Sequence, residues 1–176
     1  QALCTNLITQ PVIFSGSTIP NTQYTWTNSN PAIGLASTTG TGDIPAFTAT
    51  NLSNGPLTAL ITVTPFTNSC FGTPIQFNYT VNPIPAVNSL PNQTVCGNTL
   101  VGPIVFSGSP LGGTVFEWTN SNVNIGLPAN GTGNIQAFTI SNYNNVTVSA
   151  QITVTPVSNA CYGTPTNFSI ILIPSP

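Results

Sequence analysis

The sequence predicts an all-β protein made of two tandem β-sandwich domains. A seven-residue phrase, YTWTNSN at residues 24–30, returns as FEWTNSN at residues 116–122, and ITVTP at residues 61–65 returns unchanged at residues 152–156. Apolar and polar residues alternate over many short runs, which is the period of a half-buried β-strand. The 17 prolines and 15 glycines argue against helices of useful length. Repetition and strand periodicity together favour two copies of one small β-domain.

The expected strands follow one another in the same order in both copies. Turn signals rich in glycine, proline and asparagine separate them at intervals of about 8–12 residues, as in sandwich domains. In the first copy the alternating apolar positions are Val12 and Phe14, Tyr24 and Trp26, Phe47 and Ala49, Ala59, Ile61 and Val63, and Phe77, Tyr79 and Val81. With their counterparts in the second copy they form the candidate core, whose large aromatic members are Trp26, Trp118, Phe14, Phe106, Phe77 and Phe168.

The repeat divides the chain into residues 1–84 and residues 85–176, each of ordinary small-domain size. The copies match at a nearly constant offset, with one residue deleted from the second copy after its tryptophan phrase. The connection, VNPIPAV at residues 81–87, carries two prolines, which favour an extended and stiff link. Because Pro176 matches Pro85, we interpret the sequence as a segment of a longer array.

The last expected strand differs between the copies. Phe168 and Leu172 face one side of it, while Ile171 and Ile173 face the other, where the first copy has polar residues. A strand that is apolar on both faces needs a packing partner on both. We therefore predict that Ile171 and Ile173 form an assembly surface, which packs on a following domain or adds to the sheet edge of a neighbour.

The chain is almost uncharged. It contains no lysine, arginine or histidine and only two acidic residues, so charged side chains are 1% of the total, against roughly 25% in typical soluble domains. Without a positive patch, nucleic acid and anionic membrane surfaces are excluded as partners. No apolar run approaches the roughly 20 residues of a membrane helix, so we expect no membrane insertion. A low net charge also weakens repulsion between copies and favours self-association.

The sequence lacks the side chains that catalysis and metal binding usually require. Serine and threonine hydroxyls are common, but no histidine or lysine is present to activate one as a nucleophile. Asp43 and Glu117 match Asn134 and Thr25, so neither carboxylate recurs, and we expect polar surface in two domains rather than an acid–base pair. No CxxC motif, histidine or carboxylate cluster offers a metal site. We expect no enzymatic activity, no metal and no cofactor.

Two kinds of surface remain candidates for binding. Tyr24, Trp26, Phe116 and Trp118 could stack on sugars, but aromatics at alternating positions of a half-buried strand more often face the core. The threonine rows of the two ITVTP strands would expose a regular array of hydroxyls to solvent, a glycan, ice or another copy. Neighbouring copies or repeats are therefore the expected partners, with surface glycans as a second class.

Four cysteines occupy matching positions, two in each copy. Four cysteines allow three pairings, and the repeat favours Cys4–Cys70 with Cys96–Cys161. Each bond would close a loop of about 65 residues, worth on the order of 4 kcal/mol in the chain-entropy model. Free thiols are the alternative. Disulfides would indicate an oxidising, extracellular location.

Six phrases recur in the same order in both copies: WTNSN, IGL, GTG, AFT, ITVTP and a cysteine followed by an aromatic residue and GTP. As an ordered set they resemble the PKD-like repeats of very large secreted surface proteins of the Bacteroidota, often exported by type IX secretion. The resemblance covers nearly the whole chain. It implies immunoglobulin-like sandwiches over residues 1–84 and 85–176 that act as spacers or adhesive stalks, and it carries over no catalytic residue.

These observations together predict a structural protein. We expect a repeat segment of an extracellular fibre or adhesin stalk, in which sandwiches stapled by disulfides associate through uncharged surfaces. The alternative is a carbohydrate-binding or adhesion module appended to a larger secreted protein.

Overall fold

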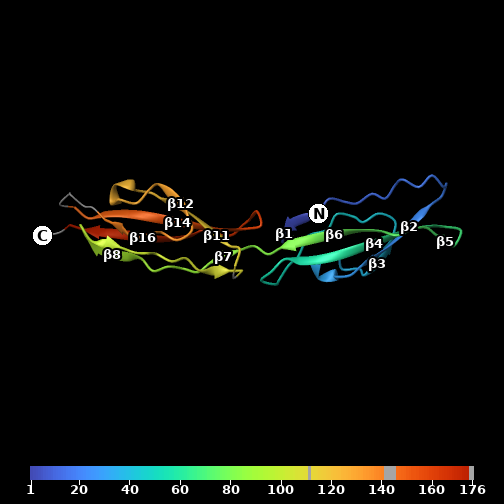
Figure 1. Cartoon of the computed structure of the whole chain (residues 1–176), viewed down its shortest axis with the longest axis horizontal. Helices are drawn as coiled ribbons and strands as arrows, with labels where there is room; N and C mark the ends of the chain where they lie inside the picture. The colour runs from blue at the N-terminus through green and yellow to red at the C-terminus, as the bar shows by residue number, and fades with distance from the viewer. Residues whose placement is uncertain (111, 141–145, 175–176) are drawn as a thin grey trace. The chain divides into compact units, whose positions relative to one another are not determined.

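The computed structural model describes residues 1–110, 112–140 and 146–174, and each half of it consists almost entirely of strands and extended chain (Figure 1). The chain divides into two compact units, Gln1–Pro83 and Ile84–Pro176, which we call unit 1 and unit 2. This division falls one residue before the boundary expected from the repeat.

Unit 1 contains one large sheet of mixed direction. Its strands are ordered β1-β6-β4-β2-β3, and the short β5 pairs with β4 beside them. β1 runs parallel to β6, and the other pairs are antiparallel. The elements are β1 (Ala2–Cys4), β2 (Gln23–Asn28), the 3-10 helix η1 (Pro31–Ile33), β3 (Thr39–Thr41), β4 (Leu57–Thr67), β5 (Cys70–Phe71) and β6 (Ile75–Asn82).

The second layer of unit 1 is extended chain with few ladder hydrogen bonds. Isolated antiparallel bridges join Ile8 to Thr48 and Val12 to Ile44. Ile44 is fully buried, and Val12 packs against the core between the two layers. Unit 1 is therefore a sandwich whose second layer is held mainly by apolar side chains rather than by a continuous ladder.

Unit 2 repeats this plan with a more complete second layer. Its large sheet is ordered β12-β11-β14-β16-β8, with β15 paired to β14 and β8 parallel to β16. Two short ladders, β13-β9 and β10-β7, lie outside this sheet. The elements are β7 (Ala86–Val87), β8 (Gln93–Cys96), β9 (Leu100–Val101), β10 (Gly108–Ser109), β11 (Val115–Asn120), the 3-10 helix η2 (Val123–Ile125), β12 (Asn130–Thr132), β13 (Phe138–Thr139), β14 (Val148–Ser158), β15 (Cys161–Tyr162) and β16 (Thr166–Ile173).

The repeated GTG phrase has a packing role. Trp26 in β2 lies opposite Gly40 in β3, and Trp118 in β11 lies opposite Gly131 in β12. A side chain at either glycine would collide with the indole ring, so only glycine leaves room for the tryptophan. Each unit therefore uses one glycine to seat its one tryptophan.

The asparagines of the repeated WTNSN phrase organise the turn that follows. Asn28 is buried, its Nδ2 donates to the Leu35 carbonyl at 2.8 Å, and its Oδ1 accepts from the Asn30 amide at 3.0 Å. The Asn30 side chain in turn accepts from the Ala32 amide at 3.2 Å and caps η1. Asn120 makes the corresponding bonds before η2. The phrase recurs because buried carbonyls and amides of the turn need these partners.

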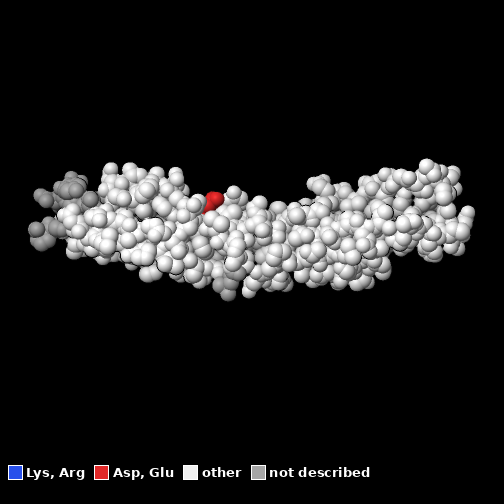
Figure 2. All heavy atoms as spheres, in the orientation of Figure 1, with Lys and Arg blue, Asp and Glu red and all other residues white. Residues whose placement is uncertain are grey.

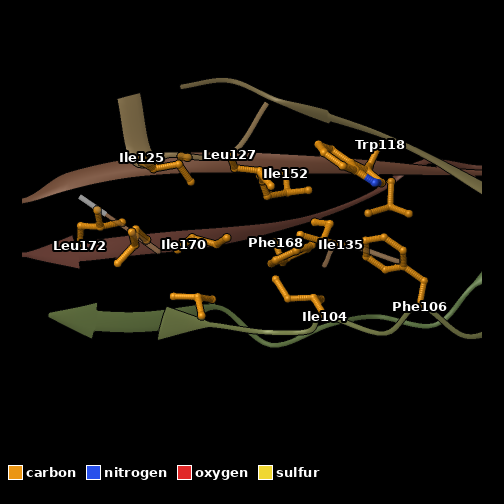
Figure 3. Close-up of a cluster of buried hydrophobic side chains, with 14 residues drawn as sticks. Ile104, Phe106, Trp118, Ile125, Leu127, Ile135, Ile152, Phe168, Ile170 and Leu172 are labelled. Carbon is orange, nitrogen blue, oxygen red and sulfur yellow. The ribbon is translucent and has the colours of Figure 1, made fainter. Parts of the chain in front are cut away.

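The core of unit 2 lies between its two layers. Figure 3 shows Trp118 and Phe168 of the large sheet facing Ile104 and Ile135 of the opposite layer. Ile152 and the other inward residues fill the space between them, at or near complete burial. Burying such side chains is the main favourable term for a domain of this size.

The structure belongs to one fold class throughout. Both units are all-β sandwiches, joined by a short connection that contains proline. The fold class predicted from the sequence is thus confirmed.

Candidate functional site

The pairing of cysteines within each repeat is wrong. Cys4 lies opposite Asn82 at the end of β6, whereas Cys70 lies in the hairpin that precedes the first residue of β6, Ile75. Seven residue steps along a strand span roughly 23 Å. A disulfide needs Cα atoms within about 7 Å of each other, so Cys4 and Cys70 lie too far apart to bond.

The same geometry separates the two cysteines of unit 2. Cys96 pairs with Ile173 at the end of β16, and Cys161 lies in the hairpin before the first residue of that strand, Thr166. Cys4 and Cys161 are disulfide-bonded, whereas Cys70 and Cys96 are free and exposed. Each unit therefore has one disulfide-bonded cysteine and one free thiol.

The bonded cysteines are the two that stand next to the connecting segment in their own units. Cys4 lies beside Asn82, the last residue of β6, after which the connection begins. Gly163, two residues after Cys161, packs directly against the carbonyl of Pro85. Cys70 and Cys96 lie at the other ends of their units.

The hairpin formed by β14 and β15 ends in a buried patch in unit 2. Pro156, Ser158, Cys161 and Gly163 are all buried, and Cys161 is only 1% exposed. We call this end of unit 2 its hairpin end. The hairpin end of unit 1 is the corresponding end, formed by β4 and β5.

The connecting segment is built into unit 2 as a strand. β7 pairs antiparallel with β10, and the Gly108 position sits against the Ala86 carbonyl with no room for a side chain. The Asn88 amide donates to the Ser107 carbonyl at 2.8 Å, and the Asn88 Nδ2 donates to the Ser107 Oγ at 2.9 Å. Val87 packs against the core. The segment thus covers one side of the hairpin end.

The hairpin end of unit 1 is open where that of unit 2 is covered. Its residues Pro65 and Thr67 are half-buried, and Cys70 and Gly72 are exposed. A side chain at Gly16, the counterpart of Gly108, would meet nothing within 4 Å. The uncovered end faces solvent along the surface where β7 lies in unit 2.

A groove occupies this uncovered surface. One cavity of about 240 Å³ is lined mainly by apolar surface and includes Gly16, Tyr24, Pro65 and Ile75. A smaller hollow of about 90 Å³ shares Pro65 with it and reaches Cys70. The groove therefore ends at a free thiol.

The large aromatic residues expected in the core are distributed unevenly. Trp26 and Trp118 are 5% and 7% exposed, so neither indole is a surface for sugar stacking. Phe106 and Phe168 are buried as well. The remaining two of the six expected core aromatics, Phe14 and Phe77, are half-buried and pack at the margin of the unit 1 core.

The two carboxylates lie in different units. The Asp43 Oδ1 accepts from the Phe14 amide at 2.9 Å, and the Asn134 Oδ1 accepts from the Phe106 amide at 2.9 Å at the matching place. Asp43 thus has the local structural role that an amide fills in the other repeat. Glu117 is exposed on β11. Among the described residues, no group of three potential metal ligands comes together.

The final strand is not available for addition to a neighbouring sheet. β14 occupies one edge of β16 and β8 occupies the other, where Ile171 pairs with Thr94 and Ile173 with Cys96. Ile171 is half-buried and Ile173 is 43% exposed. The expected alternative of strand insertion by β16 is therefore wrong, because the parallel partner β8 already fills its free edge.

The visible surface of the molecule is nearly free of charge. Figure 2 shows a face on which acidic atoms appear at one place only and basic atoms are absent, as the composition requires. Contacts made by this surface must rest on apolar burial and hydrogen bonds between neutral groups.

The search of solved structures finds matches of low similarity. The complex of Dpr2 Ig1-Ig2 with DIP-Theta Ig1-Ig3 matches with a TM-score of 0.46 and 10% identity, over 98% of this chain and 63% of that chain. Human protocadherin-24 EC1-2 matches with a TM-score of 0.42 and 16% identity, over 100% of this chain and 94% of that one. The human desmocollin-1 ectodomain matches with a TM-score of 0.39 and 12% identity, over 97% and 38%. No family model and no curated protein matches the sequence.

Helices that could span a membrane are also lacking in residues 1–110, 112–140 and 146–174.

Proposed function

We propose that this chain is a structural repeat segment of an extracellular fibre or adhesin stalk, of the PKD-like kind that the repeated phrases resemble. The observation that carries the proposal is the connecting segment, which forms a strand of unit 2 instead of a free tether. A segment that ends β6 of one sandwich and supplies β7 to the next leaves three residues between them, Pro83, Ile84 and Pro85. Such an arrangement suits a protein whose purpose is to join domains in series.

The surface chemistry supports the same role. A surface without basic residues and with two carboxylates offers neither a catalytic constellation nor an electrostatic binding site. It does offer neutral, partly apolar faces, which associate with little dependence on salt concentration. The disulfide supports an oxidising, extracellular setting.

The location of the native protein tests this function directly. Antibodies raised against the chain are used for immunogold electron microscopy of the intact source cells, without reducing agent. We expect label along filaments or stalks outside the cell, and unchanged filaments after washing in 2 M NaCl, a concentration far above the ~0.15 M of physiological ionic strength. Label confined to the cell interior, or filaments that dissolve in high salt, would contradict the proposal.

A further inference from the structure

We propose that the free edge of β12 in unit 2 is a docking site for the same edge of a second copy of this chain, so that the large sheets of two copies continue into one another. The inference rests on the proposed function in one respect, because it names the uncharged surface through which segments associate side by side. Three observations carry it: the backbone groups at this edge, the residues beside it, and the register that the edge allows.

The first observation is the direction of the backbone groups of β12. This strand is the outermost of the large sheet and pairs with β11. The amide of Gly133 and the carbonyl of Ala129, on either side of β12, both bond to β11 at 2.8 Å. Bonded and non-bonded pairs alternate in an antiparallel ladder, so Gly131 is the bonded residue between them. The N–H and C=O groups of Asn130 and Thr132 therefore point away from β11, toward the free edge.

These outward groups face open space. Asn130 and Thr132 are exposed, and they line a hollow of about 370 Å³ together with Asn134 and Gln136 of the opposite layer. The counterpart strand β3 is likewise the outermost strand of its sheet, although unit 2 follows it in the chain. Unit 2 in turn is preceded by unit 1. The edge position of this strand therefore does not depend on whether a repeat precedes or follows its unit.

The second observation is that unit 1 guards this edge and unit 2 does not. Proteins commonly protect edge strands with a charge or a proline. The counterparts of Asn134 and Gln136 in unit 1 are Asp43 and Pro45. Asp43 and Asn134 occupy equivalent places, because each accepts from the amide of the matching phenylalanine at 2.9 Å. Pairing of two copies at β3 would thus add an Asp43 carboxylate from each copy beside the junction, whereas the matching positions of unit 2 are neutral.

The third observation is that one antiparallel register uses all of the outward groups. With Asn130 of one copy opposite Thr132 of the other, each such pair exchanges both of its N–H to C=O bonds. A shift in one direction would use Pro128, which has no N–H, and a shift in the other would pass Gly133, where a φ of 70° ends the strand. The remaining register is symmetric, so the contact is two-fold and closes as a dimer.

Charge does not oppose this contact. The chain has no basic residue, and Glu117 lies opposite Thr132 in β11, one strand in from the edge. The two Glu117 side chains of a dimer would be separated by three strand spacings, roughly 14 Å, which exceeds the Debye length of about 8 Å at physiological ionic strength. Asn130 and Thr132 would lie side by side across the junction as a neutral polar pair.

The contact is small, so isolated copies should associate weakly. We expect a dissociation constant of about 0.1–1 mM, in the range of transient interfaces. In a fibre that carries many such edges, a first contact would hold the next pair of edges at a high effective concentration. Weak single contacts would then join neighbouring fibres firmly.

A proline on the edge tests the proposal with the full chain. Cys70→Ser and Cys96→Ser are present throughout, so that no disulfide links two copies. Thr132→Pro removes one outward N–H and leaves the bonds from β12 to β11 in place, which an edge strand tolerates. It should weaken dimerisation at least tenfold, measured by analytical ultracentrifugation up to about 2 mM protein.

Thr41→Pro is the matched control, because Thr41 has the same place in β3 as Thr132 has in β12. It should leave the dissociation constant unchanged. Equal weakening by the two prolines, or no association of the chain without either proline at about 2 mM, would overturn the proposal.

Amide exchange locates the contact. The amides of Asn130 and Thr132 should exchange more slowly at about 2 mM protein than at about 20 μM, because the dimer protects them. The amides of Thr39 and Thr41 should exchange at one rate at both concentrations. Protection that rises with concentration at β3 and not at β12 would overturn the assignment of the edge.

Paired charges test the register. Asn130→Glu with Thr132→Lys places a glutamate of each copy opposite a lysine of the other, and dimerisation should be at least as tight as in the unmodified chain. Asn130→Lys with Thr132→Lys places like charges opposite each other and should abolish the dimer. A dimer that survives the second pair of substitutions, or that both pairs abolish, would overturn the antiparallel register.

The outcomes separate this inference from the proposed function. Dimers that respond to these variants as expected, while the native protein is absent from extracellular filaments, would retain the docking site and reject the fibre. Filaments outside the cell, from a chain that does not associate through β12, would retain the fibre and reject the docking site. Asn130, Gly131 and Thr132 also have the spacing of an N-glycosylation acceptor. A glycan on Asn130 of the native protein would cover the edge and likewise reject the site.

Discussion

The two hairpin ends are built from nearly the same residues and differ in what covers them. Both hairpins carry a proline in the long strand, a cysteine and, two residues later, a glycine against the proline ring. In unit 2 Pro156 and Cys161 are buried, whereas in unit 1 Pro65 is half-buried and Cys70 is exposed. The sheets that support the two hairpins have matching strand pairings.

The difference comes from a segment outside the hairpin. Residues 84–88 provide the Pro85 carbonyl against Gly163 and the strand β7 against β10, while unit 1 has an open groove in the same place. Burial at this end of unit 2 therefore depends on the connecting segment at the start of that unit as well as on the hairpin strands.

Truncation of the matched phenylalanines should produce the largest difference between the units. Phe168 is 2% exposed and Phe77 is half-buried at the corresponding position. Phe168→Ala should lower the free energy of unfolding of unit 2 by about 3–5 kcal/mol, and Phe77→Ala that of unit 1 by about half as much. Urea denaturation followed by hydrogen exchange in β16 and β6 separates the units. Equal losses would mean that the half-exposed ring contributes as much as the buried one.

Replacement of the turn asparagines should affect both units equally. Asn28→Ala removes the donor to the Leu35 carbonyl, and Asn120→Ala removes the donor to the Leu127 carbonyl, in each case at 2.8 Å in a buried setting. Loss of these bonds with a carbonyl left unpaired should cost about 2–3 kcal/mol in either unit.

Asn30→Ala is the control for this pair, because it removes two bonds made at an exposed turn: the cap on the Ala32 amide and the donation from the Asn30 Nδ2 to the Thr58 carbonyl. We expect a cost of about 1 kcal/mol from it, measured by the same urea titration. A loss from Asn120→Ala that differs from that of Asn28→Ala by more than the cap effect would show that the two turns are not equivalent.

Substitution of the hairpin glycines should distinguish the covered end from the open one. A Cβ at Gly163 would collide with the Pro85 carbonyl, whereas a Cβ at Gly72 would meet first the Pro65 Cγ at 2.9 Å. Gly163→Ala should therefore cost about 1–3 kcal/mol, because the backbone of the connecting segment must move, and Gly72→Ala should cost less.

Amide exchange at Asn88, whose amide donates to the Ser107 carbonyl, reports this displacement. It should accelerate in Gly163→Ala and stay unchanged in Gly72→Ala, because only the first substitution pushes β7 away from β10. Protection of the Asn88 amide that survives Gly163→Ala would mean that the segment is held to unit 2 without the contact at Gly163.

Strand positions could be predicted from the sequence because alternation in β4, β6 and their counterparts directly reflects which side chains face the core. The burial of Asn28 could also be predicted, because Asn28 lies two residues after Trp26 and shares its inward face of β2. The sequence contains no pattern from which the state of each cysteine could be predicted. Cys4 and Cys70 occupy matching places to Cys96 and Cys161 in the sequence, and only the parallel register of β1 on β6 shows that Cys4 lies far from Cys70.

The smallest expected effect at neutral pH concerns Tyr79, which has Ile170 as its counterpart in unit 2. Its hydroxyl is buried without a hydrogen-bond partner among the described residues, and the rings of Phe47 and Phe77 pack edge-on against it at 5.2 and 5.6 Å. Burial raises the pKa of the Tyr79 hydroxyl above its ordinary value of 10.0, because the charged phenolate would lose its hydration.

This shift makes the stability of unit 1 depend on alkaline pH. The unfolded chain releases the proton near pH 10, while folded unit 1 retains it, so the unfolded state gains stability as pH rises. The contribution is therefore complete below about pH 10 and is lost as pH rises through the raised pKa. Unit 2 has no such loss at this position because isoleucine does not titrate.

Thermal unfolding at pH 8 and pH 11 measures the effect, with Cys70→Ser and Cys96→Ser present so that thiolate exchange does not interfere. Between pH 8 and pH 11 the melting temperature of unit 1 should fall further than that of unit 2. Tyr79→Phe should abolish this difference and leave the melting temperature of unit 2 unchanged. An alkaline loss in unit 1 that persists in Tyr79→Phe would assign it to another group. The comparison between the units would then rest on the covered and open hairpin ends alone.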